Sequence, residues 1–553
     1  MPSLEISKKD LEQLVGKKFK TKDELEETLQ YAKTELDSLE GDLIKCSPSD
    51  TNRPDLYSTE GIARELKSRL GISPGIPKYA VKKGNVKVTV EKTVEKTLPF
   101  FVGAVVRNVK VTEDMLIQLI QLQEKVTTTF GRRRREAAIG IYDFDKMKPP
   151  FFFRGYKDNE IEFVPLEYKV PMRPSEILLE HPKGKEFAHL LAGIERYPII
   201  IDSANQVASM PPIINSQATG KVTEKTKNLF VEVTGHKLET IQTALNVMLM
   251  ALADRGGIIE SIEIEYPKSP TYKQQKIISP QFDTGSMTVP KKLVNEITGI
   301  SLDEKKTVTL FQRSGFDVKN TKDAFIVMYP KYRQDILHAV DIIEDLLISI
   351  GYNNIELSPL KLAVLGSESK TGRELDDVRD ACIGMGLQEI LTFNLTSIEK
   401  QTRLIGIEKD EFVQIANPVS QNSEIFRKQL YPELLEFLAK NKHAQYPQKI
   451  FEVGKTVSID PSKETGCRET DKIAIVIAST TTNFTDIKSH ANALAKYSNQ
   501  KISFVETEHP TLESGKAAAV QIGNRKGILG ELSKTVSLQF GLKTPVTILE
   551  VEL

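Results

Sequence analysis

Apolar residues recur at helical spacing in two stretches of residues 1–82, and we expect a small α/β domain there. Thr21 and Glu24 form a capping box, and apolar residues at helical spacing run from Leu25 to Leu39. A second helical stripe follows a polar turn and ends at Gly71, which suits the left-handed conformation that closes a helix. We therefore expect two amphipathic helices in this region.

Residues 83–271 carry longer apolar runs separated by amphipathic stretches, and we expect a larger α/β domain there. The apolar runs predict strands over residues 100–111, 137–142, 229–233 and 258–266. The helical stripes predict helices over residues 114–130 and 238–254, and each is followed by glycine.

Residues 272–358 are expected to form a helix-rich module. Short helices are predicted over residues 290–298 and 303–313, the second capped by Ser301, with a strand over residues 325–329. A longer acidic helix follows. This layout is similar to that of a small DNA-binding domain, although such a likeness defines no function.

Residues 359–553 alternate helical stripes with strand-like runs and predict a last α+β domain. Helices are expected over residues 375–385, 430–443 and 486–497, and strands over residues 390–395, 449–457, 472–477, 517–522 and 546–551. Long helices beside a mostly antiparallel sheet are typical of this class. The chain as a whole is therefore predicted to be a multidomain α+β protein.

The acidic helix that follows Arg333 has the most informative pattern of charge. Its predicted buried stripe consists of Ile336, Val340, Ile343, Leu347 and Ile350. Four carboxylates are expected on or beside the opposite face, with the first at the N-cap position: Asp335, Asp341, Glu344 and Asp345.

No lysine or arginine occurs from Gln334 to Leu360, so these carboxylates have no cation nearby in the sequence. Like charges at this spacing repel by about 0.2–0.5 kcal/mol per pair. A hard divalent cation such as Mg²⁺ binds oxygen ligands of this kind. The simpler alternative is a solvated acidic face.

Composition restricts the class of protein further. The chain has 553 residues, which predicts roughly three to five domains. Lys plus Arg equals Asp plus Glu, at 75 each, so nucleic-acid contacts must come from local basic patches. The three cysteines form no CxxC pair, which disfavours a zinc ribbon. The chain lacks an apolar run of membrane-spanning length, and we expect a cytoplasmic protein.

Two loops of the second domain carry candidate chemistry. Arg132, Arg133, Arg134 and Arg135 form a run that can neutralise nucleic-acid phosphates; the alternative is a solvated loop. The loop of residues 209–220 combines an apolar wall, which includes Pro211, with polar groups.

The polar groups of this candidate pocket are Asn215, Ser216 and Thr219, with Thr234 on its far side. The alternative is a rigid structural turn. Nucleophile–base spacings of the Ser-His-Asp or Cys-His type are absent, so covalent catalysis is not indicated.

Five segments, in order along nearly the whole chain, resemble the β subunit of phenylalanyl-tRNA synthetase in its archaeal and eukaryotic form. They are residues 52–66, 131–143, 211–216, 333–352, and Asn417-Pro418 with Phe451-Glu452-Val453-Gly454. The resemblance implies a class II synthetase of two α and two β chains. The α chain binds ATP and charges tRNA(Phe). The β chain supports α, contacts the tRNA and hydrolyses tyrosine mischarged onto tRNA(Phe).

The same resemblance assigns roles to parts of this chain. It implies that Asp335, Asp341, Glu344 and Asp345 are Mg²⁺ ligands at the contact with α, and that residues 83–271 hold the editing pocket. Residues 359–553 are similar to a catalytic domain without its ATP motifs: the stretch from Phe426 to Gln429 lacks the glutamate of the Arg-x-Glu motif, and Glu531 is not followed by arginine. Two alternatives stay open: a freestanding deacylase acting in trans, and a non-enzymatic scaffold with decayed editing.

Overall fold

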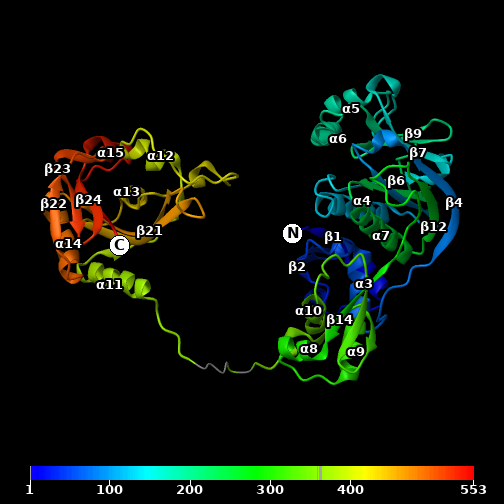
Figure 1. Ribbon diagram of the computed structural model, residues 1–553, viewed down its shortest axis with the longest axis horizontal. Coiled ribbons are helices and arrows are strands. Elements are labelled where there is room, and N and C mark those ends of the chain that lie inside the picture. Colours follow the sequence, from blue (N-terminus) through cyan, green and yellow to red (C-terminus); the bar gives the residue numbers. More distant parts are fainter. Residues whose placement is uncertain (1, 358, 360–363) are drawn as a thin grey trace. The chain divides into compact units, whose positions relative to one another are not determined.

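The computed structural model describes residues 2–357, 359 and 364–553. The chain divides into two compact units, Met1–Ser358 and Pro359–Leu553 (Figure 1). Among the helices of the described residues, none combines the length and the apolar character that a membrane crossing requires. Several sheets and many helices make the fold multidomain α+β, in agreement with the predicted class.

The first unit begins with a three-stranded sheet in the order β1-β3-β2, formed by β1 (Leu4–Ser7), β2 (Thr34–Glu40) and β3 (Leu43–Pro48). Its helices are α1 (Lys8–Val15), α2 (Lys22–Gln30) and α3 (Thr59–Arg69). Thr21 caps α2 as predicted. The predicted continuation of this helix to Leu39 is wrong: Lys33, at φ 50°, reverses the chain, and the last apolar residues of the stripe pair with β3 instead.

A ten-stranded sheet forms the centre of this unit, in the order β10-β9-β8-β7-β4-β12-β5-β11-β6, with β13 beside β12. Its strands are β4 (Val81–Val90), β5 (Phe100–Arg107), β6 (Ala137–Asp143), β7 (Phe151–Tyr156), β8 (Tyr197–Asp202), β9 (Val207–Met210), β10 (Ile214–Asn215), β11 (Leu229–Gly235), β12 (Ile258–Glu265) and β13 (Lys276–Ser279). Helix α7 (Leu238–Asp254) has the predicted bounds and packs on β5 and β11.

Helix α4 (Glu113–Thr128) contacts both α7 and β6, and Figure 1 shows it beside α7. Two short helices, α5 (Pro174–Glu180) and α6 (Pro182–Phe187), lie at the β7–β9 end of the sheet. A large apolar core lies between the sheet and α4 and α7.

The helix-rich module consists of a sheet in the order β14-β16-β15 and three helices. The strands are β14 (Thr284–Pro290), β15 (Asp317–Asn320) and β16 (Ala324–Pro330), and the helices are α8 (Lys291–Thr298), α9 (Glu304–Arg313) and α10 (Ala339–Ile350). The cap of α9 is corrected from Ser301 to Asp303, whose side chain accepts from the Lys306 N–H.

The second unit contains a seven-stranded sheet in the order β17-β20-β21-β25-β24-β23-β22, antiparallel except for β17 against β20. Its strands are β17 (Gln388–Glu389), β20 (Gln448–Ile459), β21 (Cys467–Ala478), β22 (Ile502–Glu506), β23 (Leu512–Ile522), β24 (Arg525–Leu532) and β25 (Val546–Glu552), and a separate pair is β18 (Leu395–Thr396) with β19 (Ile425–Phe426). The predicted strand over residues 390–395 is wrong except at its last residue.

Helices cover both faces of this sheet. Helices α11 (Lys370–Gly384) and α14 (Phe484–Tyr497) share one apolar core with it, and α13 (Tyr431–Lys440) and α15 (Lys534–Gln539) share another. A four-residue helix, α12 (Ile398–Gln401), contacts α13. This arrangement confirms the α+β prediction for the second unit.

A buried cluster of charges joins the small domain to the helical module. Asp345 of α10 is 1% exposed, and its carboxylate pairs with Arg69 of α3 at 2.5 Å and also with Arg333. Arg333 pairs in turn with Asp335 at 2.6 Å. Burial alone raises the pKa of Asp345, but Arg333 and Arg69 outweigh it and hold that pKa well below its usual range.

The start of the acidic helix differs from its prediction. Helix α10 begins at Ala339, so Asp335 lies before the helix and is no N-cap. The N-cap is His338, and Asp341, at the third position of the helix, accepts from the backbone N–H groups of Leu337 and His338 at 2.8 and 2.6 Å. Val340, expected in the buried stripe, is 44% exposed.

Residues outside the helix neutralise these carboxylates in part. Arg69 and Arg333 pair with Asp345, and Lys33 pairs with Glu344 at 3.0 Å. The repulsion that suggested a cation from outside the chain is therefore relieved in part by the chain itself.

Replacing Asp345 with asparagine is predicted to destabilise the first unit by about 3–5 kcal/mol, because two buried arginines lose their shared carboxylate. Urea unfolding of the purified chain, followed by circular dichroism, measures this loss. Since the pKa of Asp345 is lowered in the folded state, the stabilisation is present above the ordinary value of 3.8 and is lost as pH falls below it.

Glu344→Gln is the matched control, since it removes a half-exposed carboxylate from the same helix. Its cost is expected to stay below about 1 kcal/mol. Equal destabilisation by the two variants would contradict the assignment of Asp345 as the centre of the cluster.

Candidate functional site

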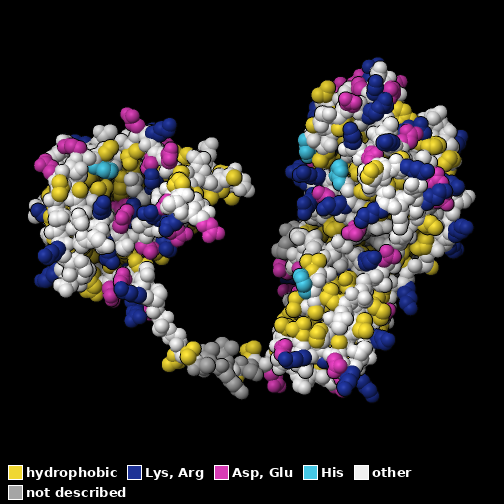
Figure 2. Space-filling model, in the orientation of Figure 1, with side chains coloured by type: hydrophobic (Ala, Val, Ile, Leu, Met, Phe, Trp, Pro, Cys, Tyr) yellow, Lys and Arg dark blue, Asp and Glu magenta, His cyan; other side chains and the backbone are white. Residues whose placement is uncertain are grey.

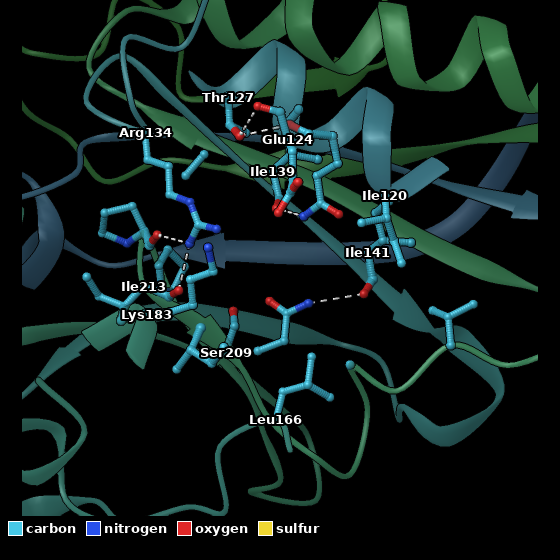
Figure 3. Close-up of a pocket in the computed structure, with 18 of the residues that line it drawn as sticks. Ile120, Glu124, Thr127, Arg134, Ile139, Ile141, Leu166, Lys183, Ser209 and Ile213 are labelled. Atoms are coloured by element: carbon cyan, nitrogen blue, oxygen red, sulfur yellow. Dashed lines mark hydrogen bonds between the residues drawn. The ribbon is translucent and has the colours of Figure 1, made fainter. Parts of the chain in front are cut away.

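A cavity of about 510 Å³ lies between the large sheet, helix α4 and the loop after β9. Apolar side chains form most of its walls, from α4 (Leu116, Leu119 and Ile120), from β6 (Ile139 and Ile141) and from the loop (Pro211, Pro212 and Ile213). Figure 3 shows Ile120, Ile139 and Ile141 on one side of the space and Ile213 and Leu166 on the other. A largely apolar cavity of this size suits a small organic group.

One end of the cavity is closed by a buried polar cluster. Glu232 of β11 is 2% exposed, and its Oε1 lies 2.9 Å from the hydroxyl of Tyr142. The same hydroxyl lies 2.8 Å from the Oγ of Ser209. A Cβ at Gly140 would lie 2.4 Å from Glu232 Oε1, so the glycine makes room for the cluster. The second carboxyl oxygen of Glu232 has no hydrogen-bond partner among the described residues.

Burial determines the charge of this cluster. It raises the pKa of Glu232 to about 8, against the opposing effect of the Tyr142 hydrogen bond. Burial also raises the pKa of Tyr142 well above its usual range. At neutral pH the cluster is therefore mainly uncharged, and the Glu232 carboxyl group can both donate and accept hydrogen bonds.

The five predicted pocket residues have different places in the structure. Pro211 and Asn215 line the cavity, and Asn215 donates to the Ile141 carbonyl at 3.2 Å. Ser216 and Thr219 are buried behind the wall, where their hydroxyls lie 3.0 Å apart and hold the loop together.

Thr234, the fifth predicted residue, is fully buried and does not line the cavity. It lies two residues after Glu232 on β11, so both side chains point to the same face of the sheet. Its hydroxyl has no hydrogen-bond partner among the described residues.

The arginine run forms a turn in which the first three members have positive φ angles, 47°, 53° and 65°. Arg132, Arg133 and Arg135 are exposed, as a phosphate contact requires. Arg134 is different: it lines the cavity and donates to the carbonyls of two loop residues, at 3.1 and 2.8 Å. On the face drawn in Figure 2, basic and acidic side chains are interspersed.

Sequence reasoning missed the residues that close the polar end, Glu232, Tyr142 and Ser209. A signal for Glu232 was present, because a single carboxylate interrupts the apolar strand Leu229–Gly235. Tyr142 and Ser209 gave no such signal, since they come close to Glu232 only when strands far apart in the sequence fold together.

The four acidic residues predicted to bind Mg²⁺ do not fit a shared four-carboxylate site in the chain as folded. Asp335 and Asp345 are held by arginines, Glu344 pairs with lysine, and Asp341 caps its helix. The described residues contain no group of three or more His, Cys, Asp or Glu side chains arranged to hold a metal. Glu344 is exposed and Asp341 is half-buried, whereas the side chains of Asp335 and Asp345 are 9% and 1% exposed.

Three family models match the chain. Residues 98–250 match a B3/4 domain, residues 287–352 match a tRNA synthetase B5 domain, and residues 357–553 match the phenylalanyl tRNA synthetase beta chain CLM domain. The cavity lies in the first of these regions and α10 in the second.

Full-length relatives extend this similarity over the whole chain. The phenylalanine–tRNA ligase beta subunit of Pyrococcus horikoshii is 43% identical and covers 100% of this chain and 99% of its own length. That of Korarchaeum cryptofilum is 36% identical, with coverage of 100% and 98%.

A solved structure gives a similar result for the first unit. The N-terminal fragment of the phenylalanyl-tRNA synthetase beta subunit from Pyrococcus horikoshii superposes with a TM-score of 0.60 at 45% identity. It covers 64% of this chain and 100% of the fragment.

Proposed function

The chain belongs to the family of phenylalanine–tRNA ligase beta subunits, and we propose that its cavity hydrolyses tyrosine mischarged onto tRNA(Phe). The observation that carries this proposal is the neutral carboxyl group of Glu232 at the closed end of an apolar cavity. Such a site matches a phenol: the ring packs on the apolar walls and the hydroxyl meets the carboxyl group.

Selectivity at this site follows from an asymmetry in hydrogen bonding. The apolar pocket in which a synthetase activates its amino acid rejects an amino acid with an added hydroxyl group only about 10²-fold. A second site that binds the hydroxyl discriminates more strongly, since phenylalanine would leave its buried polar groups unpaired. The unpartnered oxygen of Glu232 is the group that tyrosine satisfies and phenylalanine does not.

Hydrolysis at this site uses water and no covalent intermediate. The lining residues of the cavity include no cysteine. The Ser209 hydroxyl is engaged by Tyr142, at 2.8 Å. His181 is not free to act as a base, since its Nδ1 accepts from the Lys183 N–H and its Nε2 lies 3.2 Å from the Leu166 carbonyl oxygen.

The second unit supports the α chain, and ATP binds on α. Arg427, the arginine of the altered ATP motif, is buried and pairs with Glu452 at 2.7 Å. A Cβ at Gly454 would lie 2.5 Å from the Arg427 guanidinium, so the glycine makes room for this pair. Because Glu452 already neutralises Arg427, that arginine is not available to a nucleotide phosphate.

Apolar side chains on both units offer surfaces for the α chain. Leu391 and Phe393 of the second unit are 80% and 87% exposed, and Leu337 beside α10 is 70% exposed. Large exposed apolar side chains that lie close together are typical of protein interfaces. We propose a cytoplasmic α2β2 heterotetramer in which the α chain covers these surfaces. A freestanding deacylase would leave them exposed to water.

In this proposal Mg²⁺ has two ligands from this chain, fewer than the four that the sequence predicted. Asp341 and Glu344 are i and i+3 on α10, the first half-buried and the second exposed, so they can share an ion with oxygen ligands of α. The ion would act as a structural bridge, and no step of the hydrolysis depends on it.

Replacing Glu232 tests the editing site. Glu232→Val is predicted to reduce tyrosyl-tRNA(Phe) deacylation by the α–β complex at least tenfold, because the phenol hydroxyl loses its partner. Glu232→Gln is predicted to keep most of the activity, since the amide is also neutral and also donates and accepts. Release of labelled tyrosine from preformed tyrosyl-tRNA measures both variants.

Charging of tRNA(Phe) with phenylalanine by the same complexes is the control, and it should be unaffected. An unmodified complex that leaves tyrosyl-tRNA intact would favour the scaffold alternative with decayed editing. Equal activity of the valine variant and the unmodified complex would show that the hydroxyl is recognised elsewhere.

The assembly surface on α10 can be tested independently. Leu337→Ser with Val340→Ser is predicted to weaken α–β association at least tenfold, because the apolar contact is lost. Asp341→Asn with Glu344→Gln is predicted to make association insensitive to Mg²⁺. Analytical ultracentrifugation with and without EDTA measures both, and association that ignores all four changes would contradict an interface on α10.

A further inference from the structure

The two edge strands of the ten-stranded sheet meet at the cavity. Strands β10 and β6 stand at opposite ends of the strand order, yet Asn215 of β10 donates to the Ile141 carbonyl of β6 at 3.2 Å. The Asp143 N–H donates to the Thr219 carbonyl at 2.8 Å, so the loop after β10 closes the seam between the two edges at the end of β6. The cavity occupies the rest of this seam, because residues of both strands line it.

The pairing register determines which backbone groups of β6 face the seam. The Phe144 N–H donates to the Asn228 carbonyl, and the even-numbered residues of β6 stand in the same register with the even-numbered residues of β11. In an antiparallel pair every second residue bonds to the partner strand, and the residues between them turn their backbone groups away. Ile139 and Ile141 therefore direct both their N–H and their C=O groups into the seam.

The chain satisfies the carbonyl groups of this edge and leaves its N–H groups free. Gln123 donates to the Ile139 carbonyl at 2.7 Å, and Asn215 donates to the Ile141 carbonyl (Figure 3). Both isoleucines are buried, and among the described residues their N–H groups have no hydrogen-bond acceptor. Because buried backbone N–H groups are nearly always paired, two free ones at a cavity indicate an acceptor on the ligand.

The two free N–H groups have different positions relative to the polar end of the cavity. Glu232 stands opposite Gly140 in the register. Ile141 lies one residue from this level toward the closed end of the seam, and Ile139 lies one residue toward the arginine turn of residues 132–135, which precedes β6. A tRNA that contacts the exposed arginines of this turn enters from the Ile139 side. With the phenol at Glu232, the ester that joins tyrosine to the tRNA lies on that side.

We propose that the backbone N–H of Ile139 binds the ester carbonyl oxygen and stabilises the oxyanion that forms on it during deacylation. This inference rests on the proposed editing function. Water oxygen adds to the carbonyl carbon, and the carbonyl oxygen becomes the oxyanion. The ester C–O bond then breaks as the carbonyl forms again, the ribose oxygen takes up one proton of the water, and tyrosine leaves as a carboxylate with release of the other proton.

The surroundings of the Ile139 N–H suit this role. The apolar walls of the cavity lower the local dielectric, in which a hydrogen bond to a charged oxygen is strengthened. The N–H of Ile141 lies about 7 Å further along the strand, too far to share the same oxygen atom. The oxyanion therefore has one backbone donor from this edge.

An amide-to-ester replacement at Ile139 tests the proposal, because it removes the N–H and adds no atoms. The α-hydroxy analogue of isoleucine is incorporated at this position by nonsense suppression, and the α–β complex is assayed in single-turnover deacylation of tyrosyl-tRNA(Phe). The maximal rate is expected to fall about 10²-fold, as for the loss of one oxyanion donor. The enzyme concentration for half-maximal rate should change less than threefold.

The same replacement at Ile141 is the matched control. It also removes an N–H that faces the seam, and it weakens one carbonyl that pairs with β11, that of Gly140 in place of Ala138. Its maximal rate should fall less than threefold. Both complexes should keep the unfolding temperature and the phenylalanine-charging activity of the unmodified complex, which separates a catalytic loss from a structural one.

The alternative results are distinct. An unchanged maximal rate after replacement at Ile139, with an active unmodified complex, would overturn the inference and leave the editing function in place. Equal losses at Ile139 and Ile141 would also overturn it, since they would show a general weakening of β6. A raised half-maximal concentration at an unchanged maximal rate would limit the N–H to substrate binding and contradict the oxyanion role. An unmodified complex without deacylase activity would remove the proposed function and this inference together.

Discussion

The free-energy cost of withdrawing charge from water is the constraint on which this structure depends. Where the chain buries arginine for structural purposes, it supplies a carboxylate: Asp345 satisfies both Arg69 and Arg333, and Glu452 satisfies Arg427. Such pairs contribute little net stability, but removing one partner is costly, so each pair fixes the relative position of the elements that carry it. The Asp345 cluster in this way ties the small N-terminal domain to α10, and the Arg427 pair fixes the segment after β19 against β20.

The cavity follows the opposite principle. Glu232 is buried without a cation and stays neutral, and Arg134 is half-buried without a carboxylate and stays charged. Both groups have hydrogen-bonding capacity that the residues described in the structure do not use. Unused capacity of this kind is unfavourable in a structural core and useful in a binding site, because a ligand gains what the protein leaves unpaired. Helix α4 holds the cavity to the rest of the unit, since its Gln118 and Gln121 also hydrogen-bond the backbone of Glu5 in the first strand.

The sequence predicted elements well where periodicity was long and ended by glycine, as in α7, which has the expected bounds. It failed where the outcome depended on pairing between segments: the stripe to Leu39 becomes a strand because β3, which follows directly in the chain, pairs with it. The same limit applied to the candidate sites. Four carboxylates without a cation in their own stretch suggested a metal, but Asp345 pairs with Arg333, 12 residues away, and with Arg69, 276 residues away in the sequence. Part of the loop of residues 211–219 lines the cavity in the structure, with Ser216 and Thr219 buried behind it. The polar end was missed because it forms from three separate strands.

The protonation state of Glu232 is the property on which the account of the cavity depends most directly, and carbon-13 NMR of the labelled glutamate carboxyl groups measures it. The Glu232 resonance is identified as the one missing from the Glu232→Gln variant. The structure predicts a single titration near pH 8, with the protonated form dominant at pH 6.5. A resonance at the ionised position throughout the range from pH 5 to pH 9 would contradict the neutral polar end and the phenol recognition derived from it.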